Sequence, residues 1–152
     1  MSNDILVRRA ESNDADAIAQ FNIAMAWETE QKRLDPPTIT RGVRAVMENA
    51  EYGFYLVATC NDEIAGSLLV TFEWSDWRCG LFWWIQSLYV RPEFRRRGVL
   101  KTLHEFLAVE AARQGHVCGI RLYVERSNAI AQSAYAALGM QKTGYEIYET
   151  LL

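Results

Sequence analysis

The chain has 152 residues, of which 50% are hydrophobic, and it carries a formal net charge of −3. This length and apolar content suffice for one globular domain with a sizeable core, so we expect a single domain over residues 1–152. The negative net charge of the chain disfavours general binding to nucleic acid. No apolar run is long enough for a signal peptide or a membrane span, so we also expect a cytoplasmic protein with no membrane partner.

The number and spacing of the cysteine and histidine residues indicate neither a disulfide framework nor a metal site. The three cysteines, Cys60, Cys79 and Cys118, are widely spaced and form no C-x-x-C pair. His104 and His116 lie twelve residues apart on or just after an expected helix, which disfavours a shared metal site. We therefore expect reduced, structural cysteines and no bound metal.

In chain order, hydrophobic periodicity and capping residues predict the element order β-α-α-β-β-β-α-β-α-β. A strand over residues 5–10 precedes a helix that ends near Trp27, and a polar loop with two prolines, 28–37, follows. The other expected elements are a helix at about 38–48, strands at 54–59, 64–72 and 81–90, a helix at about 98–114, a strand at 119–124, a helix that Gly139 closes, and a last strand at about 141–150.

The connections between the strands predict how they pair. The turn-forming residues 60–63 make a hairpin of 54–59 and 64–72, and a second short connection leads into 81–90, so these strands are expected to be antiparallel. A helix separates 81–90 from 119–124, which allows these two strands to run parallel as a βαβ unit. The prediction is an α/β fold with a mixed, mostly antiparallel sheet.

Residues 86–103 join a buried strand to a helix through a basic turn that contains Gly98. A helix start presents free backbone N–H groups and a partial positive charge, which together favour an anion such as phosphate. Gly98 has no side chain, so a diphosphate could approach the backbone closely there. The alternative is a glycine turn with a solvated arginine run. The cations around the turn are Arg95, Arg96, Arg97 and Lys101.

Two stretches resemble motifs of the GNAT superfamily of N-acetyltransferases. Arg95-Arg-Arg-Gly98-Val-Leu100 is similar to its Arg/Gln-x-x-Gly-x-Gly/Ala acetyl-CoA loop, except that Leu100 replaces the small residue. Residues 122–140 are similar to a second pattern, in which a strand is followed by Asn128, Tyr135 and then Leu-Gly with a bulky apolar residue. The resemblance covers nearly the whole chain and implies the GNAT fold with acetyl-CoA as cosubstrate.

In that family the strands that match 81–90 and 119–124 splay apart, and the pantetheine arm of the cofactor lies between them. The resemblance implies that this arm pairs with the backbone of Leu88, Tyr89 and Val90. An N–H near Leu88 would then stabilise the oxyanion that develops on attack. The alternative is that Leu88 and Val90 are only core residues.

The resemblance assigns further residues to the cofactor and to the chemistry. Tyr135 matches a tyrosine that donates a proton to the departing CoA thiolate, although a packing tyrosine is the alternative. Asn128 either contacts the cofactor or only caps its helix. The expected contacts of the diphosphate are the turn and the first helical residues, namely Arg95, Arg96, Arg97, Gly98, Val99, Leu100 and Lys101.

The sequence leaves the general base open. An amine acceptor arrives as an ammonium ion and must lose a proton before it attacks, commonly through water to a carboxylate. Some relatives carry a glutamate at the position of Gln86, and an amide cannot take up a proton, although it can still order a water. The remaining candidates are Glu28, Glu30 and Glu73, each of which could equally be a surface carboxylate.

Acidic and aromatic residues mark the regions that wall the acceptor pocket in the family. Carboxylates beside aromatic faces suit a cationic amine. We therefore expect direct acetyl transfer from acetyl-CoA to a primary amine in a ternary complex, with a non-catalytic acyl-CoA sensor as the alternative. The residues in these regions are Trp27, Glu28, Glu30, Glu73, Trp74, Asp76 and Trp77.

The last expected strand suggests self-association. Family members usually follow the Asn128–Tyr135 helix with two strands, whereas residues 140–152 suffice for only one. An unpaired sheet edge invites pairing with another chain. We expect a homodimer in which the C-terminal strands meet or exchange, and a monomer whose last strand lies beside 119–124 is the alternative.

Overall fold

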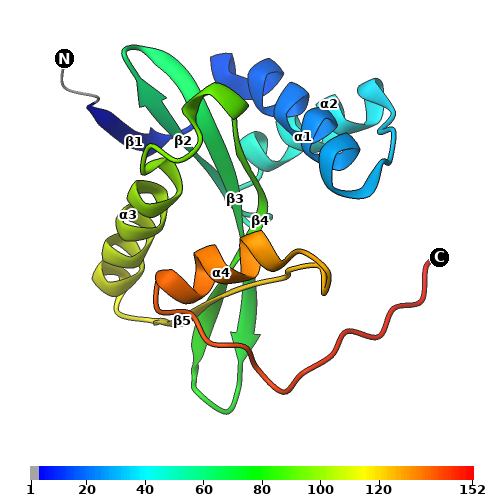
Figure 1. The fold of residues 1–152 in the computed structure, drawn as a ribbon. Coiled ribbons are helices and arrows are strands. Elements are labelled where there is room, and N and C mark those ends of the chain that lie inside the picture. Colours follow the sequence, from blue (N-terminus) through cyan, green and yellow to red (C-terminus); the bar gives the residue numbers. More distant parts are fainter. Residues whose placement is uncertain (1–3) are drawn as a thin grey trace.

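The computed structural model describes residues 4–152, which form a mixed sheet with helices on both of its faces (Figure 1). Two short 3-10 turns, Ser12–Asp14 and Pro92–Phe94, precede α1 and α3. None of the described helices is long and apolar enough to cross a membrane. The strands are β1 (Ile5–Arg9), β2 (Phe54–Cys60), β3 (Glu63–Ser75), β4 (Gly80–Val90) and β5 (Val117–Leu122), and the helices are α1 (Ala15–Glu30), α2 (Pro36–Glu48), α3 (Val99–Gln114) and α4 (Ala129–Ala137).

The sheet has the strand order β1-β2-β3-β4-β5, in which β1 to β4 are antiparallel and β4 and β5 are parallel. The predicted α/β fold, with a mixed and mostly antiparallel sheet that contains a parallel strand pair, is confirmed. The helix α3 buries Leu103 and Leu107 completely against one face. Burial of one such side chain contributes about 1.5–3 kcal/mol. The helices α1 and α2 bury Ile18 and Val43 against the opposite face.

A bulge in β4 positions the site. Ser87 has a φ of 51°, and the β3–β4 register shifts between Ser67 and Leu69. On the other side of β4, the pairing with β5 ends at Ile85 and Leu122. The remaining part of β4 therefore has no strand partner on that side, and the two parallel strands separate. We call this opening the wedge.

The prediction of a last strand at 141–150 is wrong. These residues form no strand, and β5 is an edge of the described sheet. Apolar residues alternate with polar ones here, but a strand also needs a hydrogen-bonding partner, and the segment extends away from β5 (Figure 1). Its side chains lie largely in solvent, with Tyr148 94% exposed.

Two predicted boundaries also need correction. The helix α1 does not end near Trp27 but continues to Glu30, where Gln31 takes a left-handed conformation with φ 51° and ends it. The strand β3 continues to Ser75, so Glu73 lies on a strand and not in a connection. Both changes place candidate carboxylates on rigid elements.

Candidate active site

The turn before α3 has the backbone geometry of an anion site. Gly98 is the N-cap of α3, as predicted, and has a φ of 88°. Within residues 4–152, the amides of Gly98, Val99 and Leu100 donate to no protein acceptor. A side chain atom added at Gly98 would meet nothing within 4 Å, so the space beside this residue is open. The turn therefore fits an acetyl-CoA diphosphate.

The four basic side chains around this turn have different surroundings. Arg95 turns toward α1, where Nη2 donates to Glu28 Oε2 at 2.7 Å. The guanidinium of Arg97 lies 5.2 Å from the centre of the Phe94 ring. Lys101 is exposed and lies 3.8 Å from Glu105. The backbone of Arg96 is left-handed, with a φ of 61°. The backbone amides are thus the groups of this turn that are open to an anion, and the arginines surround them.

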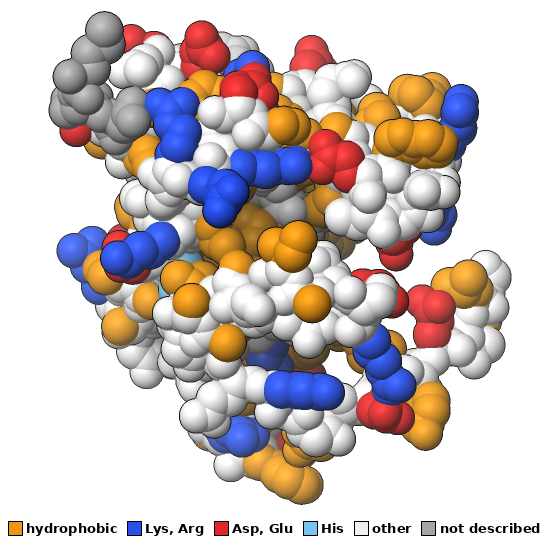
Figure 2. Space-filling view, in the orientation of Figure 1, with side chains coloured by type: hydrophobic (Ala, Val, Ile, Leu, Met, Phe, Trp, Pro, Cys, Tyr) orange, Lys and Arg blue, Asp and Glu red, His pale blue; other side chains and the backbone are white. Residues whose placement is uncertain are grey.

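An apolar groove continues from the turn along the wedge. Figure 2 shows hydrophobic side chains in a hollow below a group of Lys and Arg side chains. Leu88 and Leu100, two predicted cofactor residues, both line the groove. The lining residues are Leu68, Ile85, Leu88, Leu100, His104, Leu122, Tyr135, Leu138 and Met140.

One backbone amide of β4 faces the wedge. The amide of Arg91 donates to Ala65 O on β3 at 2.8 Å. Amide direction alternates along a regular strand, so the N–H group of Val90 points to the opposite side of β4, where β5 is no longer paired. Leu88 follows the bulge at Ser87 and lies on the same stretch of β4. This stretch is the path that the resemblance assigns to pantetheine.

Tyr135 lies in the same groove as Leu88. Burial raises the pKa of the Tyr135 hydroxyl above its usual value, so the group is protonated at neutral pH. His104 also lines the groove and was not among the predicted site residues. Burial lowers the pKa of His104, which therefore is neutral near pH 7. Its position one helical turn after Leu100 on the same face of α3 could have indicated it.

Asn128 caps α4, because its Oδ1 accepts a hydrogen bond from the amide of Ala131 at 3.1 Å. None of the residues of α4 is buried. The groove under α4 is too narrow for a water molecule, so we expect α4 to move away from β4 when a pantetheine arm enters. The helix that carries Tyr135 is therefore weakly packed.

We expect hydrogen exchange to detect this movement. Addition of saturating acetyl-CoA should slow amide exchange across residues 129–140 by at least about 10-fold, because the bound arm would hold α4 between the cofactor and solvent. Amides of β2, which lies between β1 and β3 in the sheet, serve as the control that should not change. Unchanged exchange in α4 at full cofactor occupancy would contradict this expectation.

The predicted carboxylates separate into three environments on the opposite face of the sheet. Glu28 accepts from Arg95 and also from the Tyr89 hydroxyl, at 3.4 Å. Glu73 accepts from Arg121 and Trp84. Glu30 is exposed at the end of α1, and the structure does not bring it to the others. Neither Glu28 nor Glu73 is an isolated negative charge.

Gln86 lies on the same face, where its Nε2 is 3.4 Å from Thr71 Oγ1. Trp83 and Trp84 point to opposite faces, and Trp84 is on the face of Glu73. Trp27, Trp74 and Trp77 are exposed.

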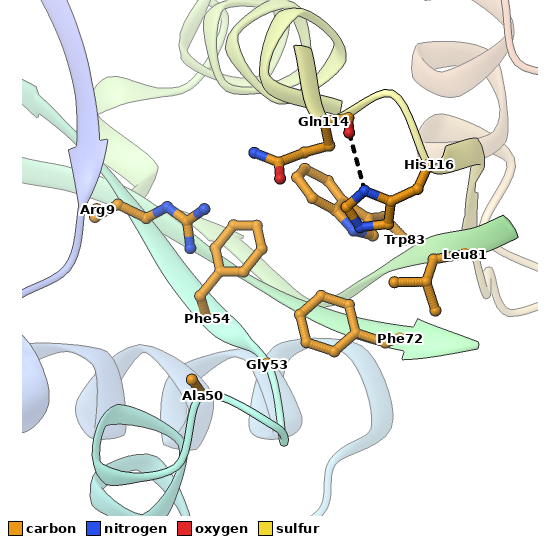
Figure 3. Close-up of a pocket in the computed structure, with 9 residues that line it drawn as sticks. All are labelled: Arg9, Ala50, Gly53, Phe54, Phe72, Leu81, Trp83, Gln114 and His116. Carbon is orange, nitrogen blue, oxygen red and sulfur yellow. Dashed lines mark hydrogen bonds between the residues drawn. The ribbon is translucent and has the colours of Figure 1, made fainter. Parts of the chain in front are cut away.

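A second pocket lies on the α3 face near the other end of β4. It has a volume of about 220 Å³, and Figure 3 shows the rings of Phe54, Phe72 and Trp83 with the guanidinium of Arg9 above Phe54. His116 Nδ1 lies 2.9 Å from Gln114 O at its rim. No residue of the two sequence motifs lines this pocket, so we do not assign the reaction to it.

Comparisons with known proteins agree with this geometry. The chain belongs to the acetyltransferase (GNAT) family, whose model matches residues 16–140. Thialysine N-epsilon-acetyltransferase of Caenorhabditis elegans is 29% identical over 125 residues, which are 82% of this chain and 68% of the relative. The chain is therefore an acetyl-CoA-dependent N-acetyltransferase, and the alternative of a non-catalytic sensor is not retained.

Solved structures have the same fold. A possible acetyltransferase from Clostridium difficile 630 is 40% identical with a TM-score of 0.91, and the match covers 97% of both chains. A predicted acetyltransferase with acetyl-CoA from Clostridium acetobutylicum is 17% identical with a TM-score of 0.77, over 97% of this chain and 96% of that one. The latter likeness shows the fold alone.

Proposed function

We propose that the enzyme transfers acetyl from acetyl-CoA directly to a primary amine of a small cationic molecule, while both are bound. The observation that carries this proposal is that Leu88 and Tyr135 line one groove, at the place where β4 and β5 separate. The C. elegans relative is named for acetylation of an amine, which supports this acceptor class. Cys60, Cys79 and Cys118 do not line the groove, which argues against a thiol relay.

The cofactor would be held by backbone groups at two places. The amides of Gly98, Val99 and Leu100 would donate to its diphosphate, and those of Leu88 and Val90 to the pantetheine arm. When bound, acetyl-CoA supplies the activated acetyl group as a thioester. The Leu88 amide would donate to the thioester carbonyl oxygen, where negative charge develops.

The side chains of the site would move two protons. Tyr135 would donate its proton to the departing thiolate, because its hydroxyl is protonated at neutral pH. Glu28 would receive the proton of the ammonium group, through water. It is the carboxylate held against β4 by the Tyr89 hydroxyl. Gln86 cannot take up a proton and would orient that water.

An acceptor screen tests the proposed function. Purified protein with acetyl-CoA should release free CoA when a suitable primary amine is present, and the acetylated amine should appear in equal amount by mass spectrometry. Release of CoA without an acetylated amine would indicate hydrolysis and contradict the proposal. Cys79 and Cys118 are exposed thiols, so CoA should be read by chromatography and not by a thiol reagent.

We also propose that two chains form a homodimer through residues 141–152. This segment exposes apolar side chains, among them Tyr145, Ile147 and Leu151, and β5 has a free edge among the described strands. A partner segment beside β5 would pair that edge and bury these side chains, and a two-fold axis would satisfy both copies.

Light scattering at micromolar concentration checks the dimer. We expect twice the monomer mass of 17.4 kDa, and a return to the monomer mass on deletion of residues 145–152. Ile147→Lys should shift the equilibrium toward monomer more than Thr150→Lys, which adds the same charge three residues later. A monomer mass for the full chain would contradict the dimer.

A further inference from the structure

The second pocket, near the end of β4 that is away from the wedge, has a floor of three aromatic rings (Figure 3). Phe54, Phe72 and Trp83 come from the neighbouring strands β2, β3 and β4, and their ring centres lie 5.2 to 6.5 Å apart in each pair. Trp83 is only 4% exposed. Rings that pack on one another from three paired strands have little freedom to move, so the floor is apolar and rigid.

The loop before β2 holds the edge of this floor in place. Gly53 has a φ of 147°, and a Cβ atom at this position would lie 2.0 Å from Val70 O. Only glycine allows the backbone to approach β3 so closely. The next residue, Phe54, is thereby fixed beside Phe72. The pocket is therefore formed before a ligand arrives, which lowers the cost of binding.

Arg9, at the end of β1, brings a positive charge to the pocket. Its guanidinium lies 3.4 Å from the centre of the Phe54 ring, so the ring supports one of its planar faces. Within residues 4–152 its N–H groups donate to no protein acceptor. The charge of Glu110 on α3 acts on Arg9, but Glu110 forms its ion pair with Arg113, at 3.1 Å. The donors in the plane of Arg9 are thus open to a carboxylate.

Gln114, the last residue of α3, adds a second polar group above the floor. Figure 3 shows its amide directed toward the Arg9 side of the pocket. This amide has no hydrogen-bonding partner in the described part of the chain, and its NH₂ group can donate to the same anion. The C-terminal end of α3 carries a partial negative charge, which disfavours an anion there. A bound carboxylate would therefore lie near Arg9, and the apolar part of the ligand would lie toward Leu81 and His116.

The size of the pocket limits the ligand to one ring. The volume of about 220 Å³ is that of roughly seven water molecules. It is below the roughly 300–1,000 Å³ that is usual for pockets that hold larger ligands. One aromatic ring with a carboxylate can enter this space, whereas a cofactor as large as acetyl-CoA cannot.

The second pocket is separate from the proposed cofactor site. It shares no lining residue with the groove of the wedge. Gln114 and Gly98 stand at opposite ends of α3, and a helix of 16 residues spans about 24 Å. A ligand in the second pocket would therefore leave the diphosphate turn open, and both ligands could bind together.

We infer that the second pocket is a binding site for a small aromatic carboxylate with a single ring. Arg9 and Gln114 bind the carboxylate, and the ring packs on the floor of Phe72 and Trp83. This inference does not depend on the proposed function, because no group of the acetyl-transfer reaction takes part in it.

NMR titrations of the protein with saturating acetyl-CoA test the inference. The probes are benzoate, benzamide, which has nearly the same shape without the charge, and acetate, which has the charge without the ring. We expect benzoate to bind at least about 10-fold more tightly than either of the others. Arg9→Gln should weaken benzoate binding at least about 10-fold and change benzamide binding less than about 3-fold. Arg41→Gln is the matched control, since Arg41 is an exposed arginine of α2 on the opposite face of the sheet.

The residues whose signals move locate the bound probe. Benzoate should shift the backbone amides of Gly53, Phe54 and Gly115 and the indole N–H of Trp83, and its affinity should be the same within about 2-fold with and without acetyl-CoA. Displacement of benzoate by acetyl-CoA would place the probe in the wedge and overturn the inference. Equal affinity for benzoate and benzamide, or an Arg9→Gln variant that binds benzoate as well as Arg41→Gln does, would also refute it. So would the absence of any shift at these residues with millimolar benzoate.

Discussion

Gly98→Asp is expected to lower acetyl-CoA affinity by about 100-fold or more. The new carboxylate would stand at the start of α3, in the open space before the amides that are free to bind a diphosphate. It would both occupy this space and repel the anion. Isothermal calorimetry with acetyl-CoA measures the loss directly, and unchanged affinity would refute the assignment of the diphosphate to this turn.

Two control variants separate charge from backbone strain. Gly98→Ala places a side chain at the same left-handed position without charge, and should cost about 1 kcal/mol of stability but little affinity. Gly115→Asp adds the same charge at the other end of α3, where φ is 74° and the surrounding space is also open. If Gly115→Asp reduced affinity as much as Gly98→Asp, the effect would be one of net charge or folding.

Tyr135→Phe is expected to lower kcat by about 10- to 10⁴-fold and to leave acetyl-CoA affinity nearly unchanged. The substitution removes only the hydroxyl that would protonate the thiolate and keeps the ring that lines the groove. The departing thiolate would then leave without a proton donor. Single-turnover kinetics with saturating acceptor isolates this step from product release.

A second buried tyrosine provides the matched control. Tyr55 lies in the core under α1 and α2, and burial raises the pKa of its hydroxyl to about 12. Tyr55→Phe should leave kcat within about 2-fold, since this hydroxyl is on the opposite face of the sheet. If Tyr135→Phe instead lowers only the melting temperature, Tyr135 is a packing residue and the proposed acid is wrong.

Local patterns in the sequence predicted most of the fold. The β-bulge of β4 and the exact ends of α1 and β3 were not predicted, because they depend on contacts with other elements. The strand at 141–150 shows the limit most clearly. Its alternating pattern is strand-like, but pairing is a property of two segments, and the pattern of one segment does not fix its partner.

The parts of the candidate site that backbone groups form were predictable from the sequence. Gly98 and the start of α3 followed from the chemistry of helix ends, and they lie where the sequence placed them. Contacts between side chains were not predictable. Glu28 and Arg95 are 67 residues apart, and Glu73 and Arg121 are 48 apart, so each pair depends on the packing of distant segments. The sequence thus named three of these residues without indicating their partners.

With the cofactor and the acceptor bound as proposed, the contact between Glu28 and Arg95 would link the two substrate sites thermodynamically. Glu28 belongs to the helix beside the acceptor, whereas Arg95 belongs to the turn that would hold the diphosphate. A diphosphate that attracts Arg95 weakens its bond to Glu28, and by reciprocity any acceptor that attracts Glu28 releases Arg95 toward the diphosphate. Both side chains are partly exposed, so the pair contributes at most about 1 kcal/mol. This corresponds to at most about a 5-fold change in the affinity of one substrate when the other is present. Cooperativity between acetyl-CoA and acceptor would then depend on residue 28, which belongs to neither of the two sequence motifs.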